Sequence, residues 1–421
     1  MKYGQLRPAL GLVVTAACLP VSGMAEADED YFKRQEIVPV SERAMAETAP
    51  VPIAAAGFEV RPEVVFAAGT QSNVLATDGN ELDDTAVGFA PRMAMVSTWA
   101  KHEFGLDAEI DHLEYSDLKD ESRTNLKIKL RGRLDLGEQT SLQVHLKTID
   151  ETEDRTALAS VPNALEPNEY SQVGAGIGVQ HQAGRWRVAA RLGLDTFDHD
   201  DAELADDLFQ DQDFRDRDVI NASARLAYAL NRDVALFADI RQEEGDYDPP
   251  NFFNALNRDY SGTVVLVGSE FELGRSIRGD IGIGYQSYTY DELAFEDIDD
   301  LAFAGSLDVA LGPRTTLSLD ADRTVTDPGI ALSNAALTTR GRLRLEQGLT
   351  AKLSVSGEAG VTQYAFESIE RDDDRTDLKL AGHWKINPNI WLEGNYQVID
   401  QSSDVQAFTD NRMFLRMRIF P

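Results

Sequence analysis

The chain has 421 residues, 43% of them hydrophobic, and its 72 acidic side chains outnumber the 40 basic ones to give a net charge of −32. A chain this acidic lacks the basic surface with which nucleic-acid-binding proteins displace counterions from phosphates, so no nucleic-acid partner is expected. Beyond the N-terminus, no apolar run approaches the roughly 18–20 residues of a membrane-spanning helix. This composition is typical of a soluble acidic protein, but a membrane β-barrel also has it, because barrel strands alternate apolar and polar residues.

The N-terminus has the layout of a secretory signal peptide. Lys2 and Arg7 precede an apolar stretch over residues 8–19, and small residues follow at Gly23 and Ala25. This order predicts a signal peptide over residues 1–25, with cleavage after Ala27 as an alternative position. A buried N-terminal helix or a membrane anchor is the competing interpretation, but the stretch is short and is interrupted by glycine and proline.

The only cysteine, Cys18, lies inside the predicted signal peptide. A mature chain without cysteine has no disulfide, no thiol nucleophile and no cysteine-based metal site. Lipidation of Cys18 is the alternative, although Thr15 stands where a lipidation box has a large aliphatic residue.

Residues 26–57 mix charges without a period, and prolines interrupt an alanine-rich run at positions 39, 50 and 52. Such a segment buries little apolar surface, so its composition predicts a flexible periplasmic linker.

From Phe58 to the C-terminus the sequence alternates apolar and polar residues with period two, which predicts β-strands. The clearest run is 126–136, where charged residues separate Leu126, Ile128, Leu130, Leu134 and Leu136. Residues 340–346 and 412–419 alternate in the same way, with arginines on the polar face. The strands are commonly a dozen residues long, which suits a tilted membrane crossing.

The connections between these runs are alternately short and long. Short turns are expected at 97–98, 137–139, 183–184, 231–232, 274–275, 312–313, 347–348 and 387–389, and all but the first contain Gly, Asn or Pro. Long polar connections are expected at 151–169, 198–218, 243–259 and 291–300. Short turns on one rim and long loops on the other are typical of an outer-membrane barrel. We therefore predict one all-β domain over 58–421, a transmembrane antiparallel up-and-down β-barrel of about 18 strands.

A large secreted β-sandwich or solenoid also has an apolar strand face, so alternation alone does not exclude it. Three features favour the barrel: the strand length, the several charges on the opposite face of each strand, and delivery to the periplasm by a signal peptide. The predicted location is the outer membrane of a Gram-negative bacterium, in contact with lipid and lipopolysaccharide.

Signatures of catalysis are missing from the sequence. The six histidines are scattered, with none at the spacing of a helical metal site, and no nucleophile elbow occurs. The glycine runs 174–178 and 282–284 lie inside predicted strands, which favours close packing over phosphate binding. The acidic stretch 198–218 lacks the ligand spacing of a calcium-binding hand loop, and a solvated acidic rim is the simpler interpretation. Neither an enzyme activity nor a metal or other cofactor is expected.

The basic residues on the polar strand faces are the best functional signal, because these faces point into the lumen if the apolar faces meet lipid. Arginine ladders opposite carboxylates narrow a pore and set its selectivity. The simpler alternative is that these charges only neutralise lumen carboxylates. The candidate translocation path consists of Lys127, Lys129, Arg131, Arg133, Arg187, Arg191, Arg340, Arg342, Arg344, Arg416 and Arg418.

Short motifs near the start of the predicted barrel resemble those of a known family. They are Arg61-Pro62-Glu63-Val64, Ser72-Asn73-Val74, Pro91 and Trp99-Ala100-Lys101-His102. The sequence resembles, over nearly the whole mature chain, the outer-membrane β-barrel porins found with capsule and exopolysaccharide synthesis genes. One departure is the C-terminus, where Pro421 takes the place usual for an aromatic residue and Phe420 is out of phase.

The resemblance implies a channel that exports a secreted exopolysaccharide or capsule. Its implied partners are the polysaccharide chain, a periplasmic polysaccharide export protein, an inner-membrane polymerase and the barrel-assembly machinery. A general or selective porin for small solutes is the alternative function, since barrel physics permits it equally.

Overall fold

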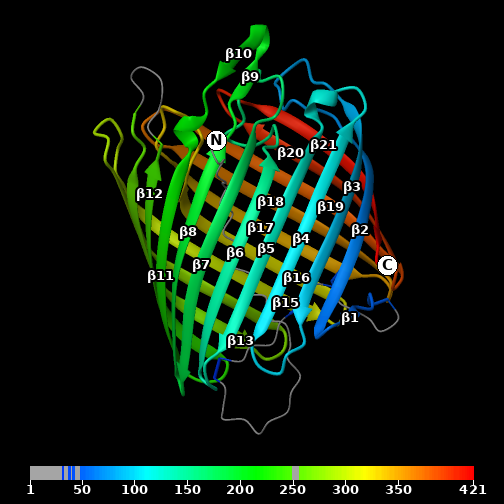
Figure 1. Ribbon diagram of the computed structural model, residues 1–421, viewed down its shortest axis with the longest axis vertical. Helices are drawn as coiled ribbons and strands as arrows, with labels where there is room; N and C mark the ends of the chain where they lie inside the picture. The colour runs from blue at the N-terminus through cyan, green and yellow to red at the C-terminus, as the bar shows by residue number, and fades with distance from the viewer. Residues whose placement is uncertain (1–30, 33–36, 39, 43–47, 249–255) are drawn as a thin grey trace.

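A computed structural model describes residues 31–32, 37–38, 40–42, 48–248 and 256–421, apart from the side chain of Asp207. The described strands form a closed antiparallel barrel of 18 strands that run obliquely around the barrel (Figure 1). The predicted fold class and strand number are therefore confirmed. No helix in the described ranges is both long and apolar enough to cross a membrane.

Consecutive barrel strands pair along the chain, with β8 next to β11 because β9 (Ala202–Leu204) and β10 (Leu208–Gln210) form a separate hairpin in the intervening loop. The barrel strands are β2 (Phe58–Gln71), β3 (Asp84–Ser97), β4 (Glu103–Tyr115), β5 (Arg123–Asp135), β6 (Thr140–Thr152), β7 (Glu169–Ala183), β8 (Trp186–His199), β11 (Arg217–Ala229), β12 (Val234–Tyr247), β13 (Tyr260–Leu273), β14 (Ile277–Tyr290), β15 (Ile298–Gly312), β16 (Thr315–Thr326), β17 (Ala336–Gly348), β18 (Leu353–Phe366), β19 (Asp372–Asn387), β20 (Ile390–Ser402) and β21 (Phe408–Ile419).

The last strand closes the barrel on the first. Pairing between β2 and β21 runs from Val64 opposite Ile419 to Gln71 opposite Arg412. The first residues of β2 pair instead with β1 (Ile53–Ala55), a short strand that precedes the barrel. Closure leaves no barrel edge along which another chain could add a strand.

The connections alternate as the sequence predicts. Tight connections such as 184–185 and 313–314 lie at one end, here called the turn rim, which also carries β1 and the end of β21. The opposite end, here called the loop rim, carries the longer connections, among them 153–168 and 200–216 (Figure 1). In an outer-membrane barrel the turn rim faces the periplasm and the loop rim faces outside.

Several strands extend further toward the loop rim than their polar ends suggest. Residues 243–247 belong to β12 and residues 298–300 to β15, although the sequence favours loops for both. Strand pairing continues there, with Glu244 opposite Ser261. Alternation of apolar and polar residues marks only the part of a strand that meets lipid, so it underestimates strand length where both faces are polar.

The outer surface carries the apolar side chains that alternate along each strand. Leu192, Leu343 and Leu415 are examples, and all are exposed on the barrel exterior. Trp186 and Trp384 are exposed near the turn rim, where aromatic girdles flank the lipid belt of membrane barrels. Because successive strand residues point to opposite faces, the charged residues between them face the lumen.

The motif residues behind the family resemblance have structural roles. Asn73 is fully buried, and its amide nitrogen donates to the carbonyl oxygens of Thr77 at 2.8 Å and Thr409 at 3.2 Å, which fixes the first loop against β21. Pro91 has no N–H to donate, and pairing between β3 and β4 is interrupted at Ala90 and Pro91.

Candidate functional site

The structure places all eleven predicted path residues on the inner wall of the barrel. They lie on β5, β8, β17 and β21, and alternate with outward-facing apolar residues such as Val188, Leu345 and Met417. Their orientation follows from the pleat of the strands. A role of these residues in a translocation path stays a prediction.

Nine of the eleven have a carboxylate partner on the wall. The pairs are Lys127–Glu151 at 2.6 Å, Arg131–Asp107, Arg133–Glu103 at 3.3 Å, Arg187–Glu270 at 2.7 Å, Arg340–Asp322 at 3.7 Å, Arg342–Glu358 at 3.8 Å, Arg344–Glu346, Arg416–Glu393 at 3.3 Å and Arg418–Glu63 at 2.5 Å. The basic ladder is thus largely neutralised by neighbouring carboxylates. Carboxylates on the same strand faces therefore share the lumen wall with the basic residues.

Lys129 and Arg191 are the two predicted residues that have no ion-pair partner among the described residues. Between their strands lie β6 and β7, and the inward face of β7 carries the run of glycines. The His145 ring lies over Gly176, where an added Cβ would come within 2.1 Å of Cε1, and the Arg191 Cγ would lie 3.2 Å from a Cβ at Gly178. The glycine run therefore provides room for basic side chains to lie flat along the wall, as the close-packing interpretation predicts.

The loop 153–168, between β6 and β7, folds into the lumen and is held by arginines of the wall. Asp154 accepts hydrogen bonds from the Arg412 guanidinium at 2.8 and 2.9 Å, and Arg412 lies inside β21, below the loop rim. The Thr156 carbonyl oxygen accepts from Arg375 Nη1 on β19 at 2.8 Å. These contacts join a loop that follows β6 to strands beyond the barrel closure.

The same loop reaches the opposite wall. Ala159 lies beside Gly329 in the loop 327–335, and a Cβ added at Gly329 would come within 2.4 Å of the Ala159 Cβ. Gly329 has a φ of +65°, which favours glycine. Loop 327–335 joins β16 to β17, about half the strand order away from β6. Together the two loops span the lumen near the loop rim, and we call this pair of loops the eyelet.

Further arginines fix the eyelet from the other side. Arg217 and Arg258 both donate to the Asp327 carboxylate, and Arg258 also donates to the Ser333 carbonyl oxygen at 3.2 Å. Arg215 donates to Glu153 at the base of loop 153–168. Cationic side chains around the mouth thereby anchor both loops through charge-assisted hydrogen bonds, which are stronger than neutral ones.

Buried ionic groups stabilise the inward course of loop 153–168. Arg155 and Glu121 form a bidentate pair whose side chains are both almost fully buried, and Arg155 Nη2 also donates to the Ala164 carbonyl oxygen at 3.0 Å. Burial raises the pKa of the Asp154 carboxyl, but the Arg412 guanidinium outweighs burial and holds this pKa well below the usual value of 3.8. Asp154 is therefore ionised at any physiological pH.

The arginines that anchor the eyelet are absent from the predicted site. Arg412 has the same parity on β21 as Arg416 and Arg418, so alternation places its side chain in the lumen. No comparable signal marks Arg215 or Arg258, which lie outside the barrel strands.

Among its described side chains, the acidic stretch 198–218 holds one carboxylate cluster. Oxygen atoms of Asp201, Asp211 and Asp213 lie within 4.8 Å of one another. Asp216 lies apart from this cluster and accepts the His199 backbone N–H at 2.7 Å. The cluster is partly exposed, as expected of a solvated acidic rim.

Comparison with known proteins gives a family match and distant structural similarity. The family model described as putative beta-barrel porin 2 matches residues 47–419. Among solved structures, OccK2 (OpdF) of Pseudomonas aeruginosa has 10% identity and a TM-score of 0.46, covering 86% of this chain and 98% of that chain. OpdL of the same species has 14% identity and a TM-score of 0.45, covering 87% and 99%. A BenF-like porin from Pseudomonas fluorescens Pf-5 has 12% identity and a TM-score of 0.45, covering 86% and 99%. A search of the curated proteins finds no match.

Proposed function

Because the chain belongs to the putative beta-barrel porin 2 family and is thus an outer-membrane barrel, we propose that it passes small water-soluble solutes across the outer membrane. The observation that carries this proposal is the eyelet, in which loop 153–168 spans the lumen from β6 to Gly329 on the opposite side. A loop held across a pore limits the size of what can pass. Family and fold point to a channel and not to an enzyme.

The chemistry of the lumen supports polar solutes, charged ones included. Paired guanidinium and carboxylate groups line the wall, so a solute can exchange water for hydrogen bonds with either kind of group. Lys129 and Arg191 add two cationic groups that form no ion pair with a described carboxylate of the wall. Many weak contacts of this kind permit transit, whereas one tight site would stall it.

Polysaccharide export, which the sequence resemblance implies, gains no support from the comparisons. A polymer would have to displace loop 153–168 from Arg412 and Arg375, which hold it by three hydrogen bonds. Asn73 and Pro91, two of the resembling positions, have structural roles here and carry no information about a polymer. We therefore rank the small-solute channel first.

The route to the membrane belongs to the same proposal. Residues 1–25 would be removed as a signal peptide, and the barrel-assembly machinery would insert the barrel among lipid and lipopolysaccharide. The exposed apolar belt and the tryptophans near the turn rim support such an insertion.

Liposome swelling tests the function. Purified barrel in liposomes is diluted into isosmotic solutions of monosaccharide, disaccharide and longer oligosaccharides, and the swelling rate is measured. We expect rapid swelling with monosaccharide and a steep fall with increasing size. Folded barrel that passes no small solute, or that passes oligosaccharides as fast as monosaccharides, would overturn the proposal.

A further inference from the structure

An apolar patch lies on the inner wall near the turn rim, where the lumen is otherwise polar. It consists of Ala227, Ala229, Ala235 and Phe237, and we call it the luminal apolar patch. The three alanines are 0% exposed and Phe237 is 5% exposed, although all four share the face of the inward arginine Arg225. Wall residues of an open, water-filled mouth would be exposed, so something covers this patch.

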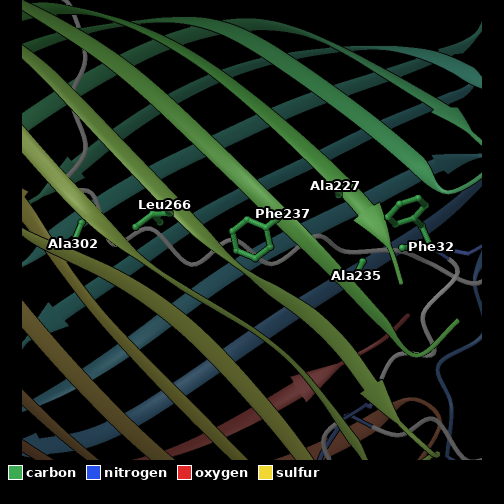
Figure 2. Packing of buried hydrophobic residues seen from close by; sticks show 7 residues of the cluster. Phe32, Ala227, Ala235, Phe237, Leu266 and Ala302 are labelled. Carbon is green, nitrogen blue, oxygen red and sulfur yellow. The ribbon is translucent and has the colours of Figure 1, made fainter. Parts of the chain in front are cut away.

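The patch is built into neighbouring strands. The Phe237 ring lies over Gly268 on β13 and Gly282 on β14. A Cβ added at Gly268 would lie 2.5 Å from the Phe237 Cζ, and one added at Gly282 would lie 3.1 Å from it. Leu266 and Ala302 continue the same apolar surface. Figure 2 shows Phe237 between Leu266 and the alanines near the strand ends. The glycines thus permit a flat apolar surface inside the barrel.

Phe32, from the N-terminal segment, packs against the alanine side of the patch. Its side chain is 7% exposed and belongs to the same buried cluster, beside Ala227 and Ala235 (Figure 2). The Arg187 guanidinium lies over the Phe32 ring, 4.5 Å from its centre, and two 2.7 Å hydrogen bonds to Glu270 fix Arg187 in place. This arrangement combines apolar burial with a cation–π contact.

Two more contacts fix the same segment to distant parts of the wall. The Ser41 N–H and hydroxyl each donate to the Glu346 carboxylate on β17 at 2.9 Å, and Glu346 is only 2% exposed. Trp391 Nε1 on β20 donates to the Thr48 carbonyl oxygen at 3.1 Å. In strand order β17 and β20 lie six and nine places beyond β11, so the contacts reach from one side of the mouth to the other.

We infer that the luminal apolar patch is a docking surface for Phe32 of the chain's own N-terminal segment, and that the contacts of Phe32, Ser41 and Thr48 tie this segment to the wall at the periplasmic mouth of the barrel. Exposed apolar surface inside a hydrated pore is unfavourable, and Phe32 removes it from water. The composition of residues 26–57 predicts a flexible linker. Composition gives no sign of the contacts made by Phe32, Ser41 and Thr48, because their partners lie far along the chain. This docking goes beyond the proposed solute passage and does not depend on which solute passes.

Thiol accessibility tests the docking. Ala227→Cys is placed in a chain carrying Cys18→Ser, and its modification by a water-soluble methanethiosulfonate reagent is timed in the purified, folded barrel. We expect slow modification with Phe32 present and at least tenfold faster modification after Phe32→Asp. Ser223→Cys, inward on the same strand but outside the patch, is the matched control and should react at one rate in both backgrounds.

A second pair of variants separates docking from misfolding. Phe32→Leu keeps an apolar side chain and should preserve the protection of Ala227→Cys. Val51→Asp adds the same charge at a position that is 76% exposed, and should also leave that protection unchanged. Bilayer conductance should rise with Phe32→Asp. Fast modification of Ala227→Cys with Phe32 intact, or one rate in all backgrounds, would overturn the inference. Failure of small solutes to cross the wild-type barrel would contradict the proposed function and leave the thiol result standing.

Discussion

Asp154 and Arg412 lie 258 positions apart in the sequence and meet inside the barrel, where two hydrogen bonds of 2.8 and 2.9 Å join carboxylate and guanidinium. Arg412 also donates from Nε to Asp410 at 2.6 Å, so the β21 wall fixes its orientation. A loop that begins at β6 is therefore anchored beyond the seam between β2 and β21. This pair ties the eyelet directly to the barrel wall.

Asp154→Asn should loosen the eyelet. The amide has one acceptor atom and no charge, so it loses part of the charge-assisted pairing that the carboxylate makes with both Arg412 nitrogens. We expect larger and noisier single-channel conductance in planar bilayers and a raised size limit in liposome swelling. Asp120→Asn, at an exposed loop position, is the matched control and should behave like wild type.

The same pair predicts how the channel responds to acid. Because the pKa of Asp154 is lower in the folded protein than in the unfolded chain, the stabilisation is complete above the unfolded value, near 3.8. It is lost only as pH falls through the lower folded value. Conductance should therefore show no opening of the eyelet between pH 7 and about pH 4. Opening near pH 5 or 6 would contradict this assignment of Asp154.

Lys129 and Arg191 should dominate ion selectivity. Neither is paired with a carboxylate, so replacing both by Glu reverses two lumen charges without removing an existing ion pair. We expect the reversal potential in a salt gradient to move toward cation selectivity while the barrel stays folded. Lys119→Glu, which changes an exposed loop charge, is the control. An identical shift in the control would place the selectivity at the outer rim instead.

The lipid face can be tested on β17. Leu343 is exposed on the barrel exterior, and Leu343→Arg should lower the free energy of unfolding by roughly 2–4 kcal/mol if the position lies near the membrane midplane. Arg342→Leu removes a half-exposed inward side chain paired with Glu358 at 3.8 Å and should be much milder. Urea titration of the detergent-refolded barrels measures both. The opposite ranking would mean that the two faces are assigned the wrong way round.

The strand faces and rims of this barrel are readable from sequence because both follow local rules. Arg342 and Leu343 are neighbours in sequence, and alternation with period two places them on opposite faces of β17. Glycine, asparagine or proline marks most of the tight turns. Arg412 also follows the period, so its inward direction is predictable. The position of its partner Asp154 is not predictable. The sequence alone indicates a solvated acidic residue in a loop, and only the tertiary fold places Asp154 against a guanidinium. The position of Phe32 is not predictable either, because nothing in the sequence marks its alanine partners as a binding surface.

Topology is testable with single cysteines in a Cys18→Ser chain. Phe209, 64% exposed on the hairpin of β9 and β10, lies beyond the loop rim, and Phe209→Cys should react with a membrane-impermeant maleimide on intact cells. Gly312→Cys lies in open space at the turn rim and should react only after the outer membrane is permeabilised. Reaction of Gly312→Cys on intact cells would show that the barrel is oriented the other way.

The most direct measurement locks loop 153–168 across the lumen. Ala159→Cys with Gly329→Cys, in a Cys18→Ser chain, brings two thiols within reach of a disulfide once a small shift of the two loops widens the Cβ separation from 2.4 Å to the roughly 3.5–4.5 Å that a disulfide spans. We expect the disulfide to form in the folded barrel, monosaccharides to cross at the rate of the reduced form, and oligosaccharides to stay excluded in both forms. Absence of the disulfide, or oligosaccharides crossing freely while it is intact, would contradict the claim that this loop sets the size limit of the channel.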